Sequence, residues 1–177
     1  IDGVGVEDDF TVEADEAEDL KITEYPENIT AGESFDLTIE ATDEHGNPAA
    51  NQNLNNFNIT SEHDGEVYSE GTITLDGSGE YTASMDSGQV TTAADNHQLT
   101  AAAEVVGEDS IDITVEVGNP DHIVISPEDS SITAGESQSY TADSYDKYHN
   151  HIENVTAETT WSIDESGHDG SWSDNNI

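Results

Sequence analysis

A repeated hexapeptide constrains this chain more than any other feature of its sequence. Ile-Thr-Ala-Gly-Glu-Ser occupies residues 29–34 and recurs unchanged at residues 132–137, 103 positions (132 − 29) further on. The match continues in the same register on both sides, through the pairs Leu20 and Ile123, Ile22 and Ile125, and residues 43–47 and 146–150. A period of this length corresponds to whole small domains, since solenoid repeats are only about 20–50 residues long. We therefore expect tandem domains rather than one large core.

The same shift sets the expected domain limits. Residues 9–13 precede their counterparts, residues 112–116, which close the first full repeat. We expect residues 1–17 to hold the last strand of a preceding repeat and a linker, residues 18–118 to form a complete domain, and residues 119–177 to form an incomplete second one. On this interpretation the chain is a segment of a longer repetitive protein.

The charge balance is extreme, with 41 acidic residues against two Lys and Arg residues and a formal net charge of −39. Affinity for nucleic acids and anionic membranes comes mainly from Lys and Arg, so neither is an expected partner of this segment. Only 32% of the residues are hydrophobic, which is typical of disorder, but their strand periodicity favours a folded protein. We interpret the acidic surface as that of a halophile, because molar salt shortens the Debye length to about 3 Å and suppresses repulsion between carboxylates.

Period-2 alternation predicts short strands throughout the complete repeat. Residues 35–42 alternate apolar and polar side chains, which is typical of a strand buried on one face. Glycine, asparagine and proline mark turns at residues 43–48 and 76–79, and the small polar residues 87–98 are expected to form a loop. Seven or more short strands in about one hundred residues predict an all-β fold, an antiparallel β-sandwich.

The turn and core motifs resemble those of a known family. The Ala-Gly-Glu turn at residues 31–33, the Asp-Glu-His-Gly-Asn-Pro turn at residues 43–48 and Leu-Asp-Gly-Ser-Gly-Glu-Tyr-Thr-Ala at residues 75–83 are similar to bacterial immunoglobulin-like domains of the invasin and intimin type. The second copy resembles related domains of archaeal surface proteins, although His149 replaces the turn glycine. The resemblance implies tandem immunoglobulin-like antiparallel β-sandwiches in an extracellular stalk on the cell surface.

Three sequences match the acceptor motif for N-linked glycans. Asn28, Asn58 and Asn154 are each followed, two positions later, by a threonine. In an exported protein these asparagines would carry glycans on the surface. The alternative is chance, because the chain is rich in asparagine and threonine.

Acidic residues near the domain limits are candidate calcium ligands, since Ca²⁺ takes about six to eight oxygen ligands. They are Asp15, Glu16, Glu18 and Asp19 before the complete repeat and Glu116, Asp121 and Glu128 at its end or beyond it. The sequence has no spaced Asp-x-Asp-x-Asp-Gly loop, so a solvated acidic face is the favoured interpretation. We predict no cofactor and keep calcium as the alternative.

No group of residues predicts catalysis. His149 and His151 are too few for a zinc site. Ser166, His168 and Asp169 are adjacent in sequence, whereas a catalytic triad is assembled from separate elements around an oxyanion hole. We therefore expect a protein that is not an enzyme.

The second copy concentrates aromatic residues, among them Tyr140, Trp161 and Trp172. Rings that stack on sugars would give a carbohydrate-binding face, but the repeat aligns Trp161 with Phe57 and favours a core position; Trp172 is left open. The sequence thus predicts a structural and interaction protein, a repeat segment of an extended cell-surface stalk or adhesin of a halophile. Its partners would be neighbouring repeats and an unknown cell-surface or glycan partner. The alternative is a non-catalytic carbohydrate-binding or spacer module of a secreted hydrolase.

Overall fold

The computed structural model describes residues 13–65 and 67–162. Strands, turns and loops make up these ranges without any helix, which confirms the predicted all-β class. Within them, accordingly, no helix has the length and apolarity needed to cross a membrane. The strand expected at residues 9–13 lies almost wholly outside the described residues, as do Ser166, His168, Asp169 and Trp172.

The first sheet has the order β1-β3-β6 and is antiparallel. Its strands are β1 (Asp19–Glu24), β3 (Phe35–Thr42) and β6 (Glu80–Met85). In β3 the alternation read from the sequence is reproduced in the burial, because Leu37, Ile39 and Ala41 are all 0% exposed. This strand therefore presents one face to the core and the other to solvent.

The second sheet has the order β2-β8-β7-β4-β5. Its strands are β2 (Asn28–Thr30), β4 (Asn53–Ser61), β5 (Val67–Thr74), β7 (Ala94–Ala103) and β8 (Gly107–Glu116). The short edge strand β2 runs parallel to β8, and the other neighbours are antiparallel. The loop predicted for residues 87–98 was too long, because β7 already begins at Ala94.

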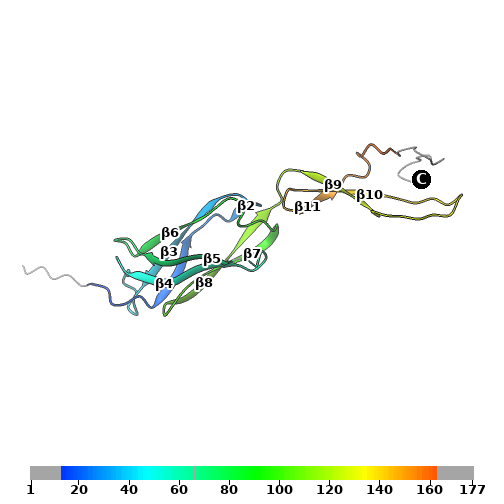
Figure 1. Ribbon diagram of the computed structural model, residues 1–177. Coiled ribbons are helices and arrows are strands. Elements are labelled where there is room, and N and C mark those ends of the chain that lie inside the picture. The colour runs from blue at the N-terminus through cyan, green and yellow to red at the C-terminus, as the bar shows by residue number, and fades with distance from the viewer. Residues whose placement is uncertain (1–12, 66, 163–177) are drawn as a thin grey trace, which may run out of the picture.

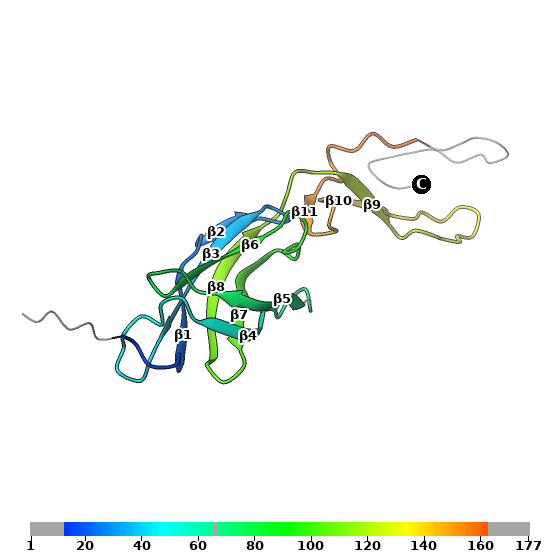
Figure 2. The same ribbon diagram turned by 60° about the vertical axis from the view of Figure 1, so that its left-hand side comes forward.

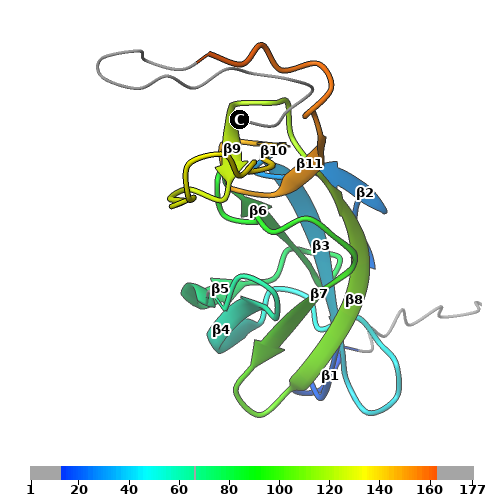
Figure 3. The same ribbon diagram turned by 90° about the vertical axis from the view of Figure 1, so that its right-hand side faces the viewer.

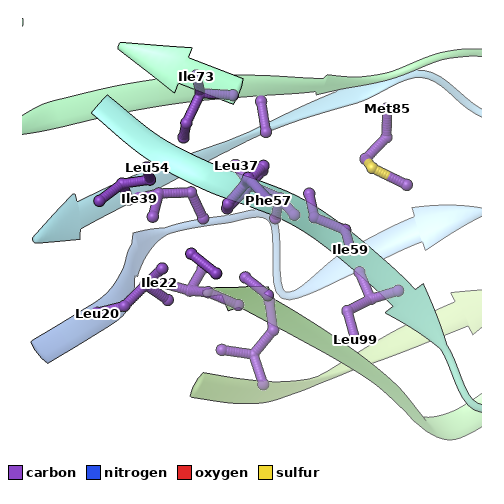
Figure 4. Packing of buried hydrophobic residues seen from close by; sticks show 14 of the residues in the cluster. Leu20, Ile22, Leu37, Ile39, Leu54, Phe57, Ile59, Ile73, Met85 and Leu99 are labelled. Carbon is purple, nitrogen blue, oxygen red and sulfur yellow. The ribbon is translucent and has the colours of Figure 1, made fainter. Parts of the chain in front are cut away.

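The two sheets face each other and enclose one hydrophobic core (Figures 2 and 3). Figure 4 shows its centre, where Leu37 and Ile39 of the first sheet meet Phe57, Ile59 and Leu99 of the second. Full burial of side chains of this size stabilises a fold by roughly 1.5–3 kcal/mol each. We call the assembly of β1–β8 the large unit.

The remaining strands form a separate three-stranded antiparallel sheet in the order β11-β10-β9. They are β9 (His122–Ser126), β10 (Thr141–Tyr145) and β11 (His151–Asn154), and we call them the small sheet. Figure 1 shows the small sheet beyond one end of the large unit, with the start of the described chain (blue) at the opposite end. The described chain is therefore elongated, with its parts arranged end to end.

Candidate functional site

The turn that joins β10 to β11 holds a buried aspartate at the junction between the small sheet and the large unit. Asp146 is only 1% exposed. Its Oδ1 accepts the backbone N–H groups of Tyr148 and Asn150, both at 2.9 Å. Its Oδ2 accepts the side-chain amide of Asn150 at 2.8 Å and the backbone N–H of Gly118, in the linker, at 2.9 Å. One carboxylate thus fixes both the turn and the linker.

Asp146 is ionised in this position despite its burial. Burial alone raises the pKa of the carboxyl, because it penalises the charged form. The hydrogen bonds from the Asn150 side chain and from the three backbone N–H groups outweigh that effect, so the pKa lies below its ordinary value. A full set of donors is what allows the charge to be buried.

Asn150 crosses from the turn to the large unit. Its Nδ2 donates to the carbonyl oxygen of Thr91 at 2.7 Å, and its Oδ1 accepts the N–H of Ala93 at 2.9 Å. Thr91 and Ala93 belong to the loop between β6 and β7, which we call the platform loop (residues 86–93). The amide therefore donates to and accepts from the backbone of the platform loop, as a neighbouring β-strand would. Asn150 is half-buried in this position.

Tyr148 packs beside this contact against two glycines. A Cβ on Gly32 would overlap the Tyr148 ring, and a Cβ on Gly88 would lie 3.5 Å from its hydroxyl. The glycines also bind each other, since Gly88 N–H donates to the Gly32 carbonyl at 3.0 Å. Both have positive φ, 78° and 87°, which favours glycine over residues with a side chain. The ring is half-buried and packs on the core of the large unit.

The platform loop is in turn held by a buried carboxylate. Asp64 accepts the Thr92 N–H at 2.9 Å, the Thr91 hydroxyl at 3.2 Å and the Ser61 hydroxyl at 3.1 Å. Its side chain is 5% exposed. Burial raises the pKa of Asp64, but hydrogen bonds from the Thr92 and Ser61 hydroxyls and from the Thr91 backbone N–H, together with the nearby His97, lower it below its ordinary value. The aspartate therefore fixes the backbone that Asn150 binds.

His97 completes this brace. Its Nδ1 lies 3.0 Å from the carbonyl oxygen of Thr92, which can only accept, so Nδ1 carries a proton. Its Nε2 lies 2.7 Å from the Ser61 hydroxyl oxygen. Burial lowers the pKa of His97, and the adjacent His63 adds to this effect, against opposing contributions from Thr92 and Asp64. The group differs from a catalytic triad, because the aspartate lies on the serine side of the ring and both His97 and Ser61 are buried. Its geometry is that of a structural brace.

A second turn repeats the Asp146 hydrogen bonds 103 positions earlier (146 − 43). Asp43 is 3% exposed, and its Oδ1 accepts the N–H groups of His45 at 2.9 Å and Asn47 at 2.8 Å. Its Oδ2 accepts the Asn47 side chain at 3.0 Å and the Asp15 N–H at 3.1 Å. The Asn47 hydrogen bonds are the main cause of a pKa far below the ordinary range. The Asp15 N–H thus donates to Asp43 as the Gly118 N–H donates to Asp146.

The three sequon asparagines lie at different depths. Asn28 on the edge strand β2 and Asn154 at the end of β11 are exposed. Asn58 is half-buried in β4, between β5 and β7, and its Nδ2 donates to the carbonyl of Asn56 at 3.1 Å. The structure thus separates two accessible acceptors from one that is partly enclosed.

The candidate calcium ligands remain separate in the described chain. All seven are exposed. One group lies before and at the start of β1: Asp15, Glu16, Glu18 and Asp19. The other lies around the linker and β9: Glu116, Asp121 and Glu128. No group of three or more His, Asp or Glu side chains suited to a metal ion occurs in the described ranges. His149 and His151 contact different neighbours, His122 and Tyr145, at ring distances of 4.8 and 5.4 Å.

The aromatic residues of the second copy that the structure describes are only partly enclosed. Tyr140 and Trp161 are half-buried, with ring centroids 6.3 Å apart. The Trp161 indole N–H donates to the Thr156 carbonyl at 3.3 Å. The core position predicted for Trp161 is therefore wrong for the described residues, where it packs less deeply than Phe57, which is 0% exposed.

The comparisons with known proteins leave the junction to be interpreted from its own geometry. No protein-family model and no curated protein matches the sequence. Among solved structures, a superoxide reductase (neelaredoxin) from Ignicoccus hospitalis is similar at 15% identity, over 58% of this chain and 82% of that chain, with a TM-score of 0.35. Two structures of the surface layer protein SbsC also match. Domains 4–9 match at 13% identity over 84% of this chain and 23% of that chain (TM-score 0.35), and domains 5–6 match at 14% over 85% and 74% (TM-score 0.31). With TM-scores this low, we infer neither the fold nor the function of this chain from these similarities.

Proposed function

We propose that this chain is a structural segment of an extended cell-surface stalk, built from tandem immunoglobulin-like repeats joined by semi-rigid junctions. The observation that carries the proposal is the contact of Asn150 with the platform loop, together with the buried Asp146 that orients it. A mobile linker would need neither a buried carboxylate nor a paired amide contact across the junction. The function is therefore mechanical: each junction limits bending between neighbouring units.

The strand order supports immunoglobulin-like units. In the immunoglobulin fold one sheet contains strands A, B and E, and the other contains C, F and G, with C′ added beside C in the variable type. The sheet β1-β3-β6 corresponds to A, B and E, and β8-β7-β4-β5 corresponds to G, F, C and C′. The invasin and intimin resemblance of the turn motifs points to the same kind of unit in surface proteins.

The chemistry of the junction suits a concentrated salt solution. The contacts across it use an amide, backbone groups, two glycines and a tyrosine ring. Among the described residues, no ion pair joins the two parts. Neutral hydrogen bonds and packing are not screened by ions, whereas surface ion pairs are. Combined with the net charge of −39, this supports an extracellular protein of a halophile.

The proposal includes N-linked glycans at the exposed acceptors. Asn28 and Asn154 are open to a modifying enzyme, whereas Asn58 lies within a paired strand. Peptide mass spectrometry of native material tests this: hexose-containing increments on the Asn28 and Asn154 peptides support an exported glycoprotein. Their absence from all three peptides removes this part of the proposal.

Distance measurements between spin labels test the mechanical function. The chain has no cysteine, so Thr82→Cys on the large unit and Glu153→Cys on the small sheet, both exposed, give a single labelled pair. In molar NaCl we expect a narrow distance distribution; a distribution as broad as that of a flexible linker would contradict a semi-rigid junction. A glycan array separates the alternative, because saturable binding of one sugar class would favour a carbohydrate-binding module of a secreted hydrolase.

A further inference from the structure

The large unit carries its two Asp-turn contacts at opposite ends. Strand β3 starts at Phe35, next to Gly32 and the platform loop, and ends at Thr42, next to Asp43. Its eight residues span roughly 25 Å at the usual rise of a strand. The Asp43 turn therefore lies at the end where the described chain starts, away from the small sheet (Figure 1).

The chain approaches the two turns by the same path. Asp15 donates its N–H to Asp43 at 3.1 Å, as Gly118 does to Asp146 at 2.9 Å. Three residues further on, the pattern continues, with matched backbone bonds from Glu18 to Thr42 and from Asp121 to Tyr145, both at 2.8 Å. Residues 13–18 are thus held against the large unit as the linker is held against the small sheet.

The two turns differ in what they contact outside themselves. Asn150 is half-buried by the platform loop, whereas Asn47 is exposed. The Asn47 Nδ2 donates to Asp43, and no described residue donates to its Oδ1. His45, the counterpart of Tyr148, has 72% of its side chain exposed. The hydrogen bonds of the Asp43 turn therefore hold it in the same shape as the Asp146 turn. Among the described residues, however, Asn47 and His45 have no platform loop to contact.

We propose that the Asp43 turn is a docking surface for the platform-loop end of another sandwich of the same repeat, placed immediately before Asp15. This inference rests on the proposed function. The large unit itself shows the matching groups: a carbonyl at position 91 and an N–H at position 93, which an asparagine amide spans, and a glycine pair that takes a ring. In the docked pair Asn47 binds the platform loop of the preceding sandwich, and His45 lies over its glycines.

Position along one chain is essential to the proposal. One amide and one ring make a small contact surface, and two separate chains, each with a net charge of −39, repel one another except at high salt. Linkage through residues 13–18 makes the contact intramolecular and raises the effective concentration to about the millimolar range. The occupant is therefore a preceding repeat rather than a free second molecule.

The experiment adds one copy of residues 15–117 directly before Asp15 of the full chain. This joint keeps the 103-residue period, since Asp15 then follows Val117 of the added copy in the place of Gly118. Spin labels at Thr82→Cys in both copies report the new junction, and labels at Thr82→Cys of the original copy and Glu153→Cys report the existing one. We expect the new junction to give a narrow distance distribution in molar NaCl.

Two variants make the result specific. Asn47→Ala in the original copy should remove the narrow peak of the new junction and leave the existing junction unchanged, and Asn150→Ala should do the reverse. The unfolding midpoint of Asn47→Ala in the chain without the added copy shows that the large unit still folds. A broad new junction beside a narrow existing one, or a narrow peak that survives Asn47→Ala, overturns the docking proposal and leaves the proposed function standing. Broad distributions at both junctions overturn both.

Discussion

The side-chain amide of Asn150 lies 2.7 Å from the backbone carbonyl of Thr91, a residue 59 positions earlier in the chain. Its carbonyl oxygen accepts the N–H of Ala93 from the same loop. The amide therefore satisfies two backbone groups that regular secondary structure leaves unpaired at this end of the large unit. Leaving a partly buried donor or acceptor without a partner costs about 1–3 kcal/mol, so this single side chain has a measurable effect on the junction.

Removing that amide should free the platform loop. In Asn150→Ala we expect the Ala93 N–H to exchange with solvent deuterium about ten times to a hundred times faster, since each 1.4 kcal/mol corresponds to about a factor of ten. Asn55→Ala is the matched control, because Asn55 is exposed and its side chain binds Thr72 within the second sheet. Unchanged exchange at Ala93 in Asn150→Ala would show that the contact does not hold the loop.

Gly32 should be the least replaceable glycine of the junction. Gly32 and Gly46 have nearly the same φ, 78° and 80°, but a Cβ on Gly46 meets nothing within 4 Å, whereas a Cβ on Gly32 overlaps Tyr148. Gly46→Ala should therefore cost about 1–2 kcal/mol in backbone strain, and Gly32→Ala should cost clearly more. Denaturant unfolding in molar NaCl measures both free energies of unfolding.

The additional cost of Gly32→Ala should depend on the ring. In a Tyr148→Ala background, where the overlap is gone, the two glycine substitutions should become equally costly; this double-mutant cycle isolates the packing contribution. A difference that persists without the ring would place the strain in the platform loop itself. At position 149, the counterpart of Gly46, a histidine with φ 67° shows that the turn accepts a Cβ there.

The local features of the fold could be predicted because each has a short-range signal. The alternation in residues 35–42 records burial of one face, and the glycine, asparagine and proline of residues 43–48 record the backbone angles of a tight turn. The Asn-rich start of β4 has no such signal. Asn53 and Asn55 pair there with Thr74 and Thr72 of β5 through side-chain hydrogen bonds of 2.7 and 3.0 Å, so tertiary context determines strand formation against propensity.

The candidate site could not be predicted in the same way. The sequence shows that Asp146 and Asn150 form a turn, since the repeat aligns them with Asp43 and Asn47. It does not show that the Asn150 amide faces a loop 59 residues away. The brace of Asp64, His97 and the platform loop was also missed. His97 and most of the platform loop lie in residues 87–98, which were interpreted as loop, and the sequence analysis did not single out Asp64. The only signal of the brace was a histidine at an inward position of β7, where it is 0% exposed.

His97 should make stability depend on pH in mildly acidic solution. Burial, the largest cause, lowers the pKa of its imidazole below the ordinary 6.5. The unfolded chain therefore takes up the proton first, and stability falls as the pH drops below about 6.5 until the folded-state pKa is reached. The slope from this one proton is at most about 1.4 kcal/mol per pH unit. The lowered pKa of Asp64 makes its own contribution in a lower window, below the ordinary 3.8.

Denaturant unfolding at pH 7.0, 6.0 and 5.0 in molar NaCl measures that slope. His97→Gln should flatten it, whereas His45→Gln, at an exposed position of the Asp43 turn, should keep it. The comparison uses slopes rather than absolute free energies, so it holds even if His97→Gln lowers stability throughout. An equal slope in the two variants would assign the pH dependence to other groups.

Lowering the salt concentration should disrupt the junction before it unfolds the β-sheets. With a net charge of −39, the exposed carboxylates repel one another over the Debye length, which grows from about 3 Å at 1 M salt to about 30 Å at 0.01 M. The small sheet depends on a few neutral contacts and has exposed apolar residues on β9, so we expect Ala93 exchange to accelerate before the far-UV β signal weakens. Replacing the exposed Asp95, Glu108 and Asp112 with their amides should shift both transitions to lower salt, because repulsion falls with the charge. A β signal and an Ala93 exchange rate that stay constant from molar to millimolar NaCl would contradict the salt dependence and with it the halophilic interpretation of the acidic surface.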